Sequence, residues 1–234
     1  MPRRHVLVTG ANRGLGLEFC RQLLARGDHV VATSRHPAQA QELNRLAGEH
    51  PGRLHVLPLD VTNPRSEAEL ARELPLVLGD ERLDVLINNA GLLHPGERFG
   101  HVPASNLEDS FRTNAMGPFL LTQALAPLLA DGAKVANLSS QLGSIGNTQR
   151  FGTPTYCISK AALNMATRLL AHALAERGIS IVSLHPGWVA TDMGGESAPL
   201  VPMQSVQGLL QVIDGLGMAH SGSFLDWQGQ ALPW

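Results

Sequence analysis

Short apolar runs alternate along the chain with longer segments of helical periodicity. Apolar runs predict strands at residues 5–9, 29–33, 54–59, 83–88, 134–139, 179–185 and 223–226. Helical patterns between them predict helices over about 14–26, 37–48, 105–130, 154–177 and 203–217, and one that begins at Pro64. Asn63 is expected to cap the helix that begins at Pro64, because proline suits the first helical position.

Strict alternation of strand and helix predicts an α/β fold. Consecutive strands are then joined by right-handed crossovers into a parallel sheet of about seven strands, with helices on both faces. The continuous apolar character of the strands agrees, because both faces of such a sheet are covered. We expect residues 1–234 to form a single domain. Ligands of such folds bind beyond the carboxyl ends of the strands, so the functional residues are expected in the loops there.

The first of these loops is TGANRGLG, residues 9–16. It follows a strand and opens a helix, which is the context of a phosphate-binding loop. Gly10 allows a tight turn, while Gly14 and Gly16 allow a pyrophosphate and the helix N-terminus to come close. A plain tight turn between strand and helix is the simpler alternative.

The second loop bears on the type of dinucleotide. Sites for NAD usually carry an acidic residue after the second strand, to hold the ribose 2′-hydroxyl. Here the sequence is ATSRHP, with Arg35 and no acid, and Arg13 lies inside the glycine loop. Two guanidinium groups suit a 2′-phosphate, so NADP(H) is expected in preference to NAD(H). The alternative is that Arg35 is only solvated.

The next three loops add polar candidates. Asp60 follows the third strand, where its carboxylate can accept a hydrogen bond from an adenine amino group. NNAG, residues 88–91, follows the fourth strand, and its small residues allow backbone contact with a cofactor. Its asparagines alternatively stabilise a turn with their own side chains. Ser139 and Ser140 follow the fifth strand, and in the simpler reading they only cap a turn.

Tyr156, the chain's single tyrosine, precedes Lys160, one of only two lysines, by four residues. This spacing places both side chains on one face of a helix. A nearby ammonium favours the phenolate, so we expect a lowered pKa for the phenol of Tyr156. An incidental pair on a helix face is the alternative.

Composition and charge exclude several classes of function. The net charge is −2, which gives no basic field for nucleic acid or an anionic membrane. Residues 119–135 are apolar but interrupted by Gln123, Pro127 and Asp131, so a buried helix rather than a membrane span is expected. The two cysteines and the absence of a signal-peptide pattern suggest a cytoplasmic protein. The histidines have no metal-binding spacing, so no metal site is expected.

Taken together, TGANRGLG, NNAG, Asn114, the serine pair, the Tyr156–Lys160 spacing and PGWVAT resemble the short-chain dehydrogenase/reductase family in their order. GWVATDMGG and SGSFLDWQGQALPW resemble its C-signal/Sniffer-like carbonyl reductase subgroup. The resemblance implies a Rossmann-like doubly wound sheet. It also implies Tyr156 as catalytic acid/base, Lys160 as its activator, Ser140 as the hydroxyl that orients the substrate, and Asn114 as part of a proton relay. The cofactor would then contact Gly10, Asn12, Arg13, Gly14, Leu15, Gly16, Arg35, Asp60, Val61, Asn88, Ala90, Gly91, Tyr156, Lys160, Pro186, Gly187, Val189 and Thr191.

One departure from the family concerns the catalytic serine. The interval from Ser140 to Tyr156 is longer than usual in the family, which leaves Ser139 and Ser144 as alternatives. We expect an NADPH-dependent oxidoreductase acting on a small-molecule carbonyl or alcohol. The helices over 105–130 and 154–177 resemble those that form homodimers or homotetramers in this family. Alternatives are a non-catalytic dinucleotide sensor or signalling protein on the same scaffold, and an interaction protein without a cofactor.

Overall fold

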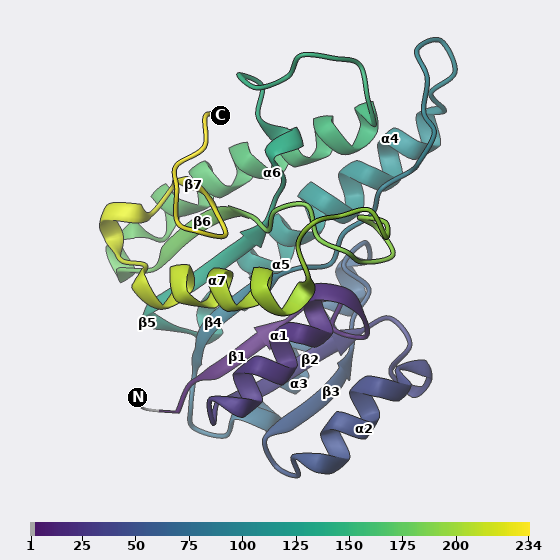
Figure 1. Ribbon diagram of the computed structural model, residues 1–234. Helices are drawn as coiled ribbons and strands as arrows, with labels where there is room; N and C mark the ends of the chain where they lie inside the picture. The colour runs from purple at the N-terminus through teal and green to yellow at the C-terminus, as the bar shows by residue number, and fades with distance from the viewer. Residues whose placement is uncertain (1–2) are drawn as a thin grey trace.

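A parallel sheet of seven strands organises the structure, a computed structural model that describes residues 3–234. The strand order is β3-β2-β1-β4-β5-β6-β7 (Figure 1). The strands are β1 His5–Val8, β2 His29–Ser34, β3 Leu54–Pro58, β4 Leu83–Asn88, β5 Leu129–Leu138, β6 Ser180–His185 and β7 Phe224–Asp226. The helices are α1 Gly14–Ala25, α2 Gln41–Glu49, α3 Pro64–Leu78, α4 Ala104–Phe111, α5 Gly117–Leu125, α6 Pro154–Ala173 and α7 Pro202–Gly215. The expected Rossmann-like doubly wound fold is confirmed.

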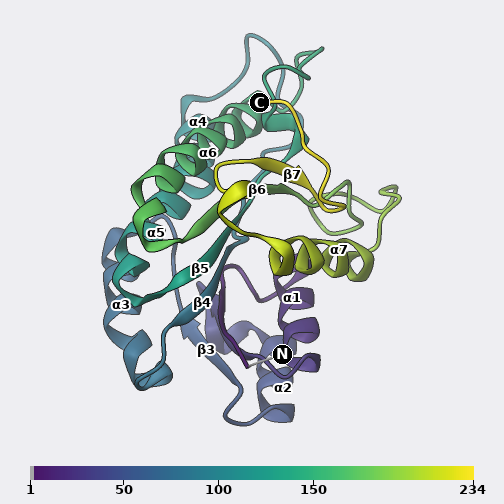
Figure 2. The ribbon, with the colours of Figure 1, turned by 90° about the vertical axis from the view of Figure 1, so that its left-hand side faces the viewer.

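Helices cover both faces of the sheet and bury a separate apolar cluster on each. Successive side chains of a strand point to opposite faces. Val6 and Val8 of β1 therefore pack in a cluster with α1, α2 and α7, whereas Leu7 packs in the cluster with α3, α5 and α6. Figure 2 shows these two helical layers on either side of the sheet. Strands buried on both faces explain the unbroken apolar runs of the sequence.

The long helix expected over 105–130 is interrupted in the structure. A π-helical turn, Arg112–Met116, separates α4 from α5, and the N–H of Gly117 bonds to the carbonyl of Arg112 five residues back. Pro118 has no N–H to donate to the helical ladder, which favours the interruption. Asn114 lies in the centre of this turn and is fully buried. Such turns are frequent at functional sites.

Prolines also lie at other boundaries that differ from the predicted ones. Pro127 lies in a short 3₁₀ turn, Ala126–Leu128, so that β5 already begins at Leu129. The segment predicted as a helix from 37 begins with another 3₁₀ turn, Pro37–Gln39. The helix predicted to reach 177 ends at Ala173. At the start of α3 the prediction is confirmed, because Asn63 Oδ1 accepts a hydrogen bond of 3.0 Å from the N–H of Arg65.

The longest helix, α6, carries both Tyr156 and Lys160. It has twenty residues, and its inward face holds polar side chains as well as apolar ones, among them Ser159 and Asn164. Neither α6 nor any other helix within residues 3–234 is long and apolar enough to cross a membrane. The polar inward face of α6 instead borders the carboxyl edge of the sheet.

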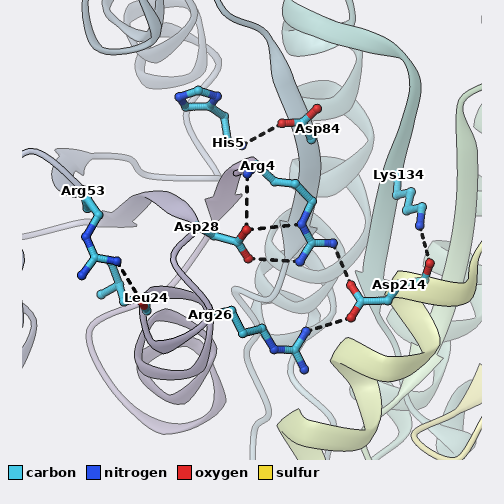
Figure 3. Close-up of polar contacts among 9 residues, drawn as sticks. All are labelled: Arg4, His5, Leu24, Arg26, Asp28, Arg53, Asp84, Lys134 and Asp214. Carbon is cyan, nitrogen blue, oxygen red and sulfur yellow. Dashed lines mark hydrogen bonds and ion pairs between the residues drawn. The ribbon is translucent and has the colours of Figure 1, made fainter. Parts of the chain in front are cut away.

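At the opposite, amino-terminal edge of the sheet, charged side chains join distant parts of the chain (Figure 3). Arg4 bonds to Asp28 at 3.0 Å and to Asp214 of α7 at 2.7 Å. Arg26 also bonds to Asp214, at 2.9 Å, and Lys134 donates to the carbonyl oxygen of Asp214 at 2.7 Å. This cluster ties β1, α1 and β5 to the end of α7.

Candidate active site

A cavity of about 460 Å³ lies at the carboxyl edge of the sheet. Six of the loops that follow the strands contribute to it, together with α6, as the doubly wound topology predicts. Of the residues predicted to bind a cofactor, those that line it are Gly10, Asn12, Arg13, Gly14, Leu15, Arg35, Val61, Ala90, Gly91, Tyr156, Lys160, Pro186 and Thr191. Most of the predicted contacts are therefore brought together at one place.

The loops after β1 and β4 are bonded directly to each other. The hydroxyl of Thr9 accepts hydrogen bonds from the N–H groups of Asn89 and Ala90, at 2.9 and 3.0 Å. In return, the side-chain amide of Asn89 donates to the carbonyl oxygens of Thr9 and Gly10. Gly10 has a φ of 62°, and a Cβ there would lie 2.9 Å from the Cα of Ala90. The close approach of the two loops thus requires glycine at this position.

The N-terminus of α1 faces the cavity with donors that the helix itself does not use. Arg13 is the N-cap residue and makes no side-chain capping bond, and no acid occupies the first turn. The first backbone N–H groups of a helix have no partner within the helix, and the helix dipole makes this end positive. Gly14 and Leu15 border the cavity here. This arrangement fits the pyrophosphate of a dinucleotide.

Two arginines flank the part of the cavity that follows β2. Arg35 lines it beside Ser34 and His36. Arg13 lines it from the glycine loop and forms an ion pair with Asp192, which follows β6. Both members of this pair are largely exposed, so the pair contributes little to stability. The donor set fits an additional phosphate on the ribose.

Tyr156 and Lys160 are both buried in the cavity wall. Lys160 Nζ lies 5.5 Å from the centre of the Tyr156 ring and donates a hydrogen bond of 2.6 Å to the carbonyl oxygen of Leu138. Burial raises the pKa of the Tyr156 phenol to about 12, although its hydrogen bond with Ser140 opposes the rise. Burial also lowers the pKa of the Lys160 ammonium to about 7. The expected lowering of the phenol pKa is wrong here, because desolvation by burial is the largest effect on the phenol.

The three candidate serines differ in what their hydroxyl groups contact. Ser139 is the one of the three that lines the cavity, but its hydroxyl is turned to the interior, where it donates to Asn164 Oδ1 at 2.7 Å. Ser144 accepts a bond from the N–H of Asn147 and lies near the carbonyl oxygen of Trp234. Ser140 accepts from the N–H of Leu142 and is the serine whose side chain hydrogen-bonds with Tyr156. The geometry therefore favours Ser140 as the partner of the phenol.

Asn114 lies behind the cavity rather than in its wall. Its side chain bonds to both backbone groups of Leu92, accepting at 2.8 Å and donating at 2.7 Å. It also donates to the hydroxyl of Ser159 on α6. The π-helical turn thus attaches the loop after β4 to the helix that carries Tyr156.

Several predicted cofactor residues lie outside the cavity lining and have structural roles. The amide of Asn88 donates to Thr122 and Asn137 in the interior. Asp60 accepts bonds from the N–H and hydroxyl of its neighbour Thr62. The remaining three support the backbone conformation. A Cβ at Gly16 would collide with Gly10, and Gly187 has a φ of 84° and lies next to Trp227. Val189 forms a β-bridge with Leu200.

Four of the residues that sequence reasoning missed have a clear role at this site. Thr9 and Asn89 belong to the quoted motifs, but their mutual bonding cannot be read from sequence. Thr113, next to Asn114, lines the cavity. Asp192 was part of the quoted segment after β6, and its pairing with Arg13 depends on the fold. Within residues 3–234, no three His, Cys, Asp or Glu side chains form a group that could hold a metal ion.

Comparison with known proteins agrees with this geometry. Residues 4–200 match the family described as short chain dehydrogenase. The chain belongs to this family. It is 40% identical to an NADPH-bound carbonyl reductase from chicken fatty liver and 38% identical to the carbonyl reductase Sniffer of D. melanogaster, each with a TM-score of 0.95. The coverage is 100% of both chains for the former, and 99% of this chain and 100% of that chain for the latter.

A further relative, C-signal of Myxococcus xanthus, is 46% identical over 154 residues. That match covers 65% of this chain and 93% of C-signal. These relatives bear out the resemblance to the C-signal/Sniffer-like group and support an oxidoreductase of the carbonyl reductase type.

Proposed function

We propose that this protein is an NADPH-dependent reductase that converts a small-molecule carbonyl compound reversibly into an alcohol. The observation that carries the proposal is the Tyr156 phenol, buried in the wall of the cavity, hydrogen-bonded with Ser140 and close to Lys160. A dinucleotide sensor needs the glycine loop but has no need of a positioned proton donor.

The side chains supply what carbonyl reduction requires besides hydride. The raised pKa keeps the Tyr156 phenol protonated at neutral pH, so that it can donate its proton to the developing alkoxide. Ser140 orients the carbonyl oxygen beside the phenol and stabilises negative charge there. By resemblance to the family, Lys160 would hold the ribose of the cofactor. Asn114 would support a proton relay from behind the cavity, where its side chain bonds to Leu92 and Ser159.

The cavity fits NADP(H), which supplies the hydride when bound. The N-terminus of α1 binds the pyrophosphate through Gly14 and Leu15. Arg13 and Arg35 bind the 2′-phosphate, which sets the preference over NAD(H). One of the solved relatives is an NADPH-bound carbonyl reductase, which supports this choice.

The proposal is tested by oxidation of NADPH over a panel of aldehydes, ketones and diketones, with wild type and Tyr156→Phe. We expect turnover in wild type, a loss of at least about 100-fold in the variant, and unchanged NADPH binding. Cys157→Ser, at the next position, is the matched control and retains activity. Turnover that survives in Tyr156→Phe contradicts the role of the phenol. Tight NADPH binding without turnover on any compound favours the sensor.

We further propose that the protein forms a homodimer through α4 and α6. Their outer faces expose apolar side chains, among them Phe111, Ile158, Met165 and Leu169. Apolar side chains gathered on one face favour burial against a second copy. Light scattering is expected to report a dimer for wild type and a monomer for Met165→Glu combined with Leu169→Glu. A wild-type monomer at micromolar concentration contradicts this assembly.

A further inference from the structure

The helix that carries Tyr156 begins without an ordinary N-cap. Thr153, its N-cap residue, has a φ of 42° and makes no side-chain capping bond. It is the one non-glycine residue with a positive φ within 3–234, and a β-branched residue in this conformation is strained. Pro154 has no N–H. The first backbone donor of α6 is therefore the N–H of Thr155, directly before Tyr156.

A carboxylate from another part of the chain satisfies this donor. Glu97, in the loop between β4 and α4, accepts a bond of 3.2 Å from the N–H of Thr155. It accepts a second from the Thr155 hydroxyl, at 2.9 Å. A negative charge is favourable at a helix N-terminus, because the helix dipole makes that end positive. Glu97 is half-buried, whereas its neighbours Gly96 and Arg98 are exposed.

The same contact is joined to α4. Asn106 donates a hydrogen bond of 3.2 Å to Glu97, and Ser110 donates one of 3.1 Å to the hydroxyl of Thr155. Thr155 and Ser110 are almost completely buried. The loop after β4, α4 and the first turn of α6 are thus joined at one point, one residue from the phenol.

We propose that Glu97 is a positioning residue of the active site: it caps α6 from outside the helix and so holds the Tyr156 phenol in the cavity wall. The inference rests on the proposed function for its catalytic consequence only. Without the cap, the first turn of α6 frays, since its strained N-cap residue offers no replacement. The phenol then becomes accessible to water and loses its alignment with Ser140.

Tyr156 is the single tyrosine of the chain, so its ionisation can be followed directly by tyrosinate absorbance, with or without a substrate. At a pH near the ordinary tyrosine pKa of about 10, wild type is expected to remain largely protonated, and Glu97→Ala to be about half ionised. Glu73→Ala, an exposed glutamate of α3, is the matched control and is expected to behave as wild type. Circular dichroism on the same samples verifies that each variant is folded.

Kinetics give the second measurement. We expect kcat of Glu97→Ala to fall about 10- to 100-fold, with KM for the carbonyl substrate and NADPH affinity changed less than about 3-fold. Glu97→Gln keeps an oxygen that can accept from Thr155 N–H, so it recovers most of the loss. If Glu97→Ala does not fold, Glu97→Leu, which fills the same space but offers no acceptor to Thr155 N–H, is compared with Glu97→Gln by the same measurements.

The outcomes separate the two proposals. Equal tyrosine ionisation in Glu97→Ala and Glu73→Ala overturns the positioning role, whatever the activity. A shifted ionisation together with a wild type that reduces no carbonyl compound supports the positioning role and counts against the proposed function. A lower melting temperature with unchanged ionisation and kcat identifies Glu97 as a structural residue only, and this also overturns the inference.

Discussion

Lys160 Nζ lies over the face of the Tyr156 ring, 5.5 Å from its centre. The two side chains are one helical turn apart, and both are withdrawn from water. Burial disfavours the charged form of each, so that the phenol titrates at about 12 and the ammonium at about 7 in the protein alone. At neutral pH the phenol is therefore held as a proton donor, which suits the direction of carbonyl reduction.

The depressed pKa of Lys160 predicts that stability depends on pH. The folded protein releases this proton near pH 7, whereas the unfolded chain retains it up to its ordinary value of 10.5. The unfolded state binds more protons in that window, so the free energy of unfolding rises with pH there. In wild type, the free energy of unfolding is expected to rise by about 2 kcal/mol between pH 7 and about 9 through this group. In Lys160→Met, which cannot titrate, this rise is expected to be absent. Urea unfolding at both pH values measures it, and parallel profiles for the two proteins contradict it.

The arginines of the cavity predict cofactor preference. Arg35→Ala is expected to weaken NADPH binding about 10- to 100-fold, because charge-assisted hydrogen bonds to the 2′-phosphate are lost. NADH binding is expected to change less than about 3-fold, since NADH lacks that phosphate. Arg13→Ala is expected to weaken NADPH binding more than NADH binding as well. Arg72→Ala, on α3, is the control and is expected to leave the binding of both cofactors unchanged. Equal losses for both cofactors in fluorescence titrations count against a 2′-phosphate site.

Two glycines predict opposite outcomes for one substitution. A Cβ at Gly16 would lie 2.3 Å from the carbonyl oxygen of Gly10 and 2.6 Å from Asn89 Nδ2. Gly16→Ala is therefore expected to cost about 1–3 kcal/mol of stability and to weaken NADPH binding. Gly48 lies in α2, with nothing near a new Cβ, so Gly48→Ala is expected to stabilise by about 0.5–1 kcal/mol. Denaturant unfolding of both variants checks the contrast; a destabilised Gly48→Ala argues against the packing seen at α2.

The charged cluster at the amino-terminal edge predicts a loss of stability without a loss of activity. Asp214→Asn removes the ion pairs with Arg4 and Arg26, at 2.7 and 2.9 Å. We expect a cost of about 2 kcal/mol in unfolding free energy, because the largely buried guanidinium of Arg4 loses one of its two anionic acceptors and keeps only Asp28. Asp131→Asn, in the exposed pair with Arg177, is the control and should cost less than about 0.5 kcal/mol. A changed kcat in Asp214→Asn would show coupling between the two edges of the sheet.

The fold and about half of the cavity lining were predictable because they depend on local pattern. Apolar runs of strand length alternating with helical periods imply a parallel sheet, and its loops necessarily meet at one edge. Interruptions were harder to predict. The π-helical turn at Asn114 arises where Pro118 breaks the ladder, and neither the periodicity of 105–130 nor the proline alone specifies which residue takes up the irregularity.

Asn88 and Asn89 illustrate what sequence leaves open at a site. They are adjacent and chemically identical, yet Asn88 bonds to Thr122 and Asn137 in the interior, while Asn89 fastens the glycine loop. Which of two neighbours faces the ligand depends on where the strand ends, since side chains alternate between faces. A shift of one residue exchanges their roles.

By itself, the sequence determined the order of strands and helices, the glycine-rich loop after β1 and the spacing of Tyr156 and Lys160, because each depends on residues close together in the chain. Only the tertiary structure decided the protonation of the phenol, the choice of Ser140 among three serines and the capping of α6 by Glu97. These depend on burial and on contacts between residues far apart in the chain. Desolvation of a buried group depends on everything packed around it, so no local pattern contains its sign or its size.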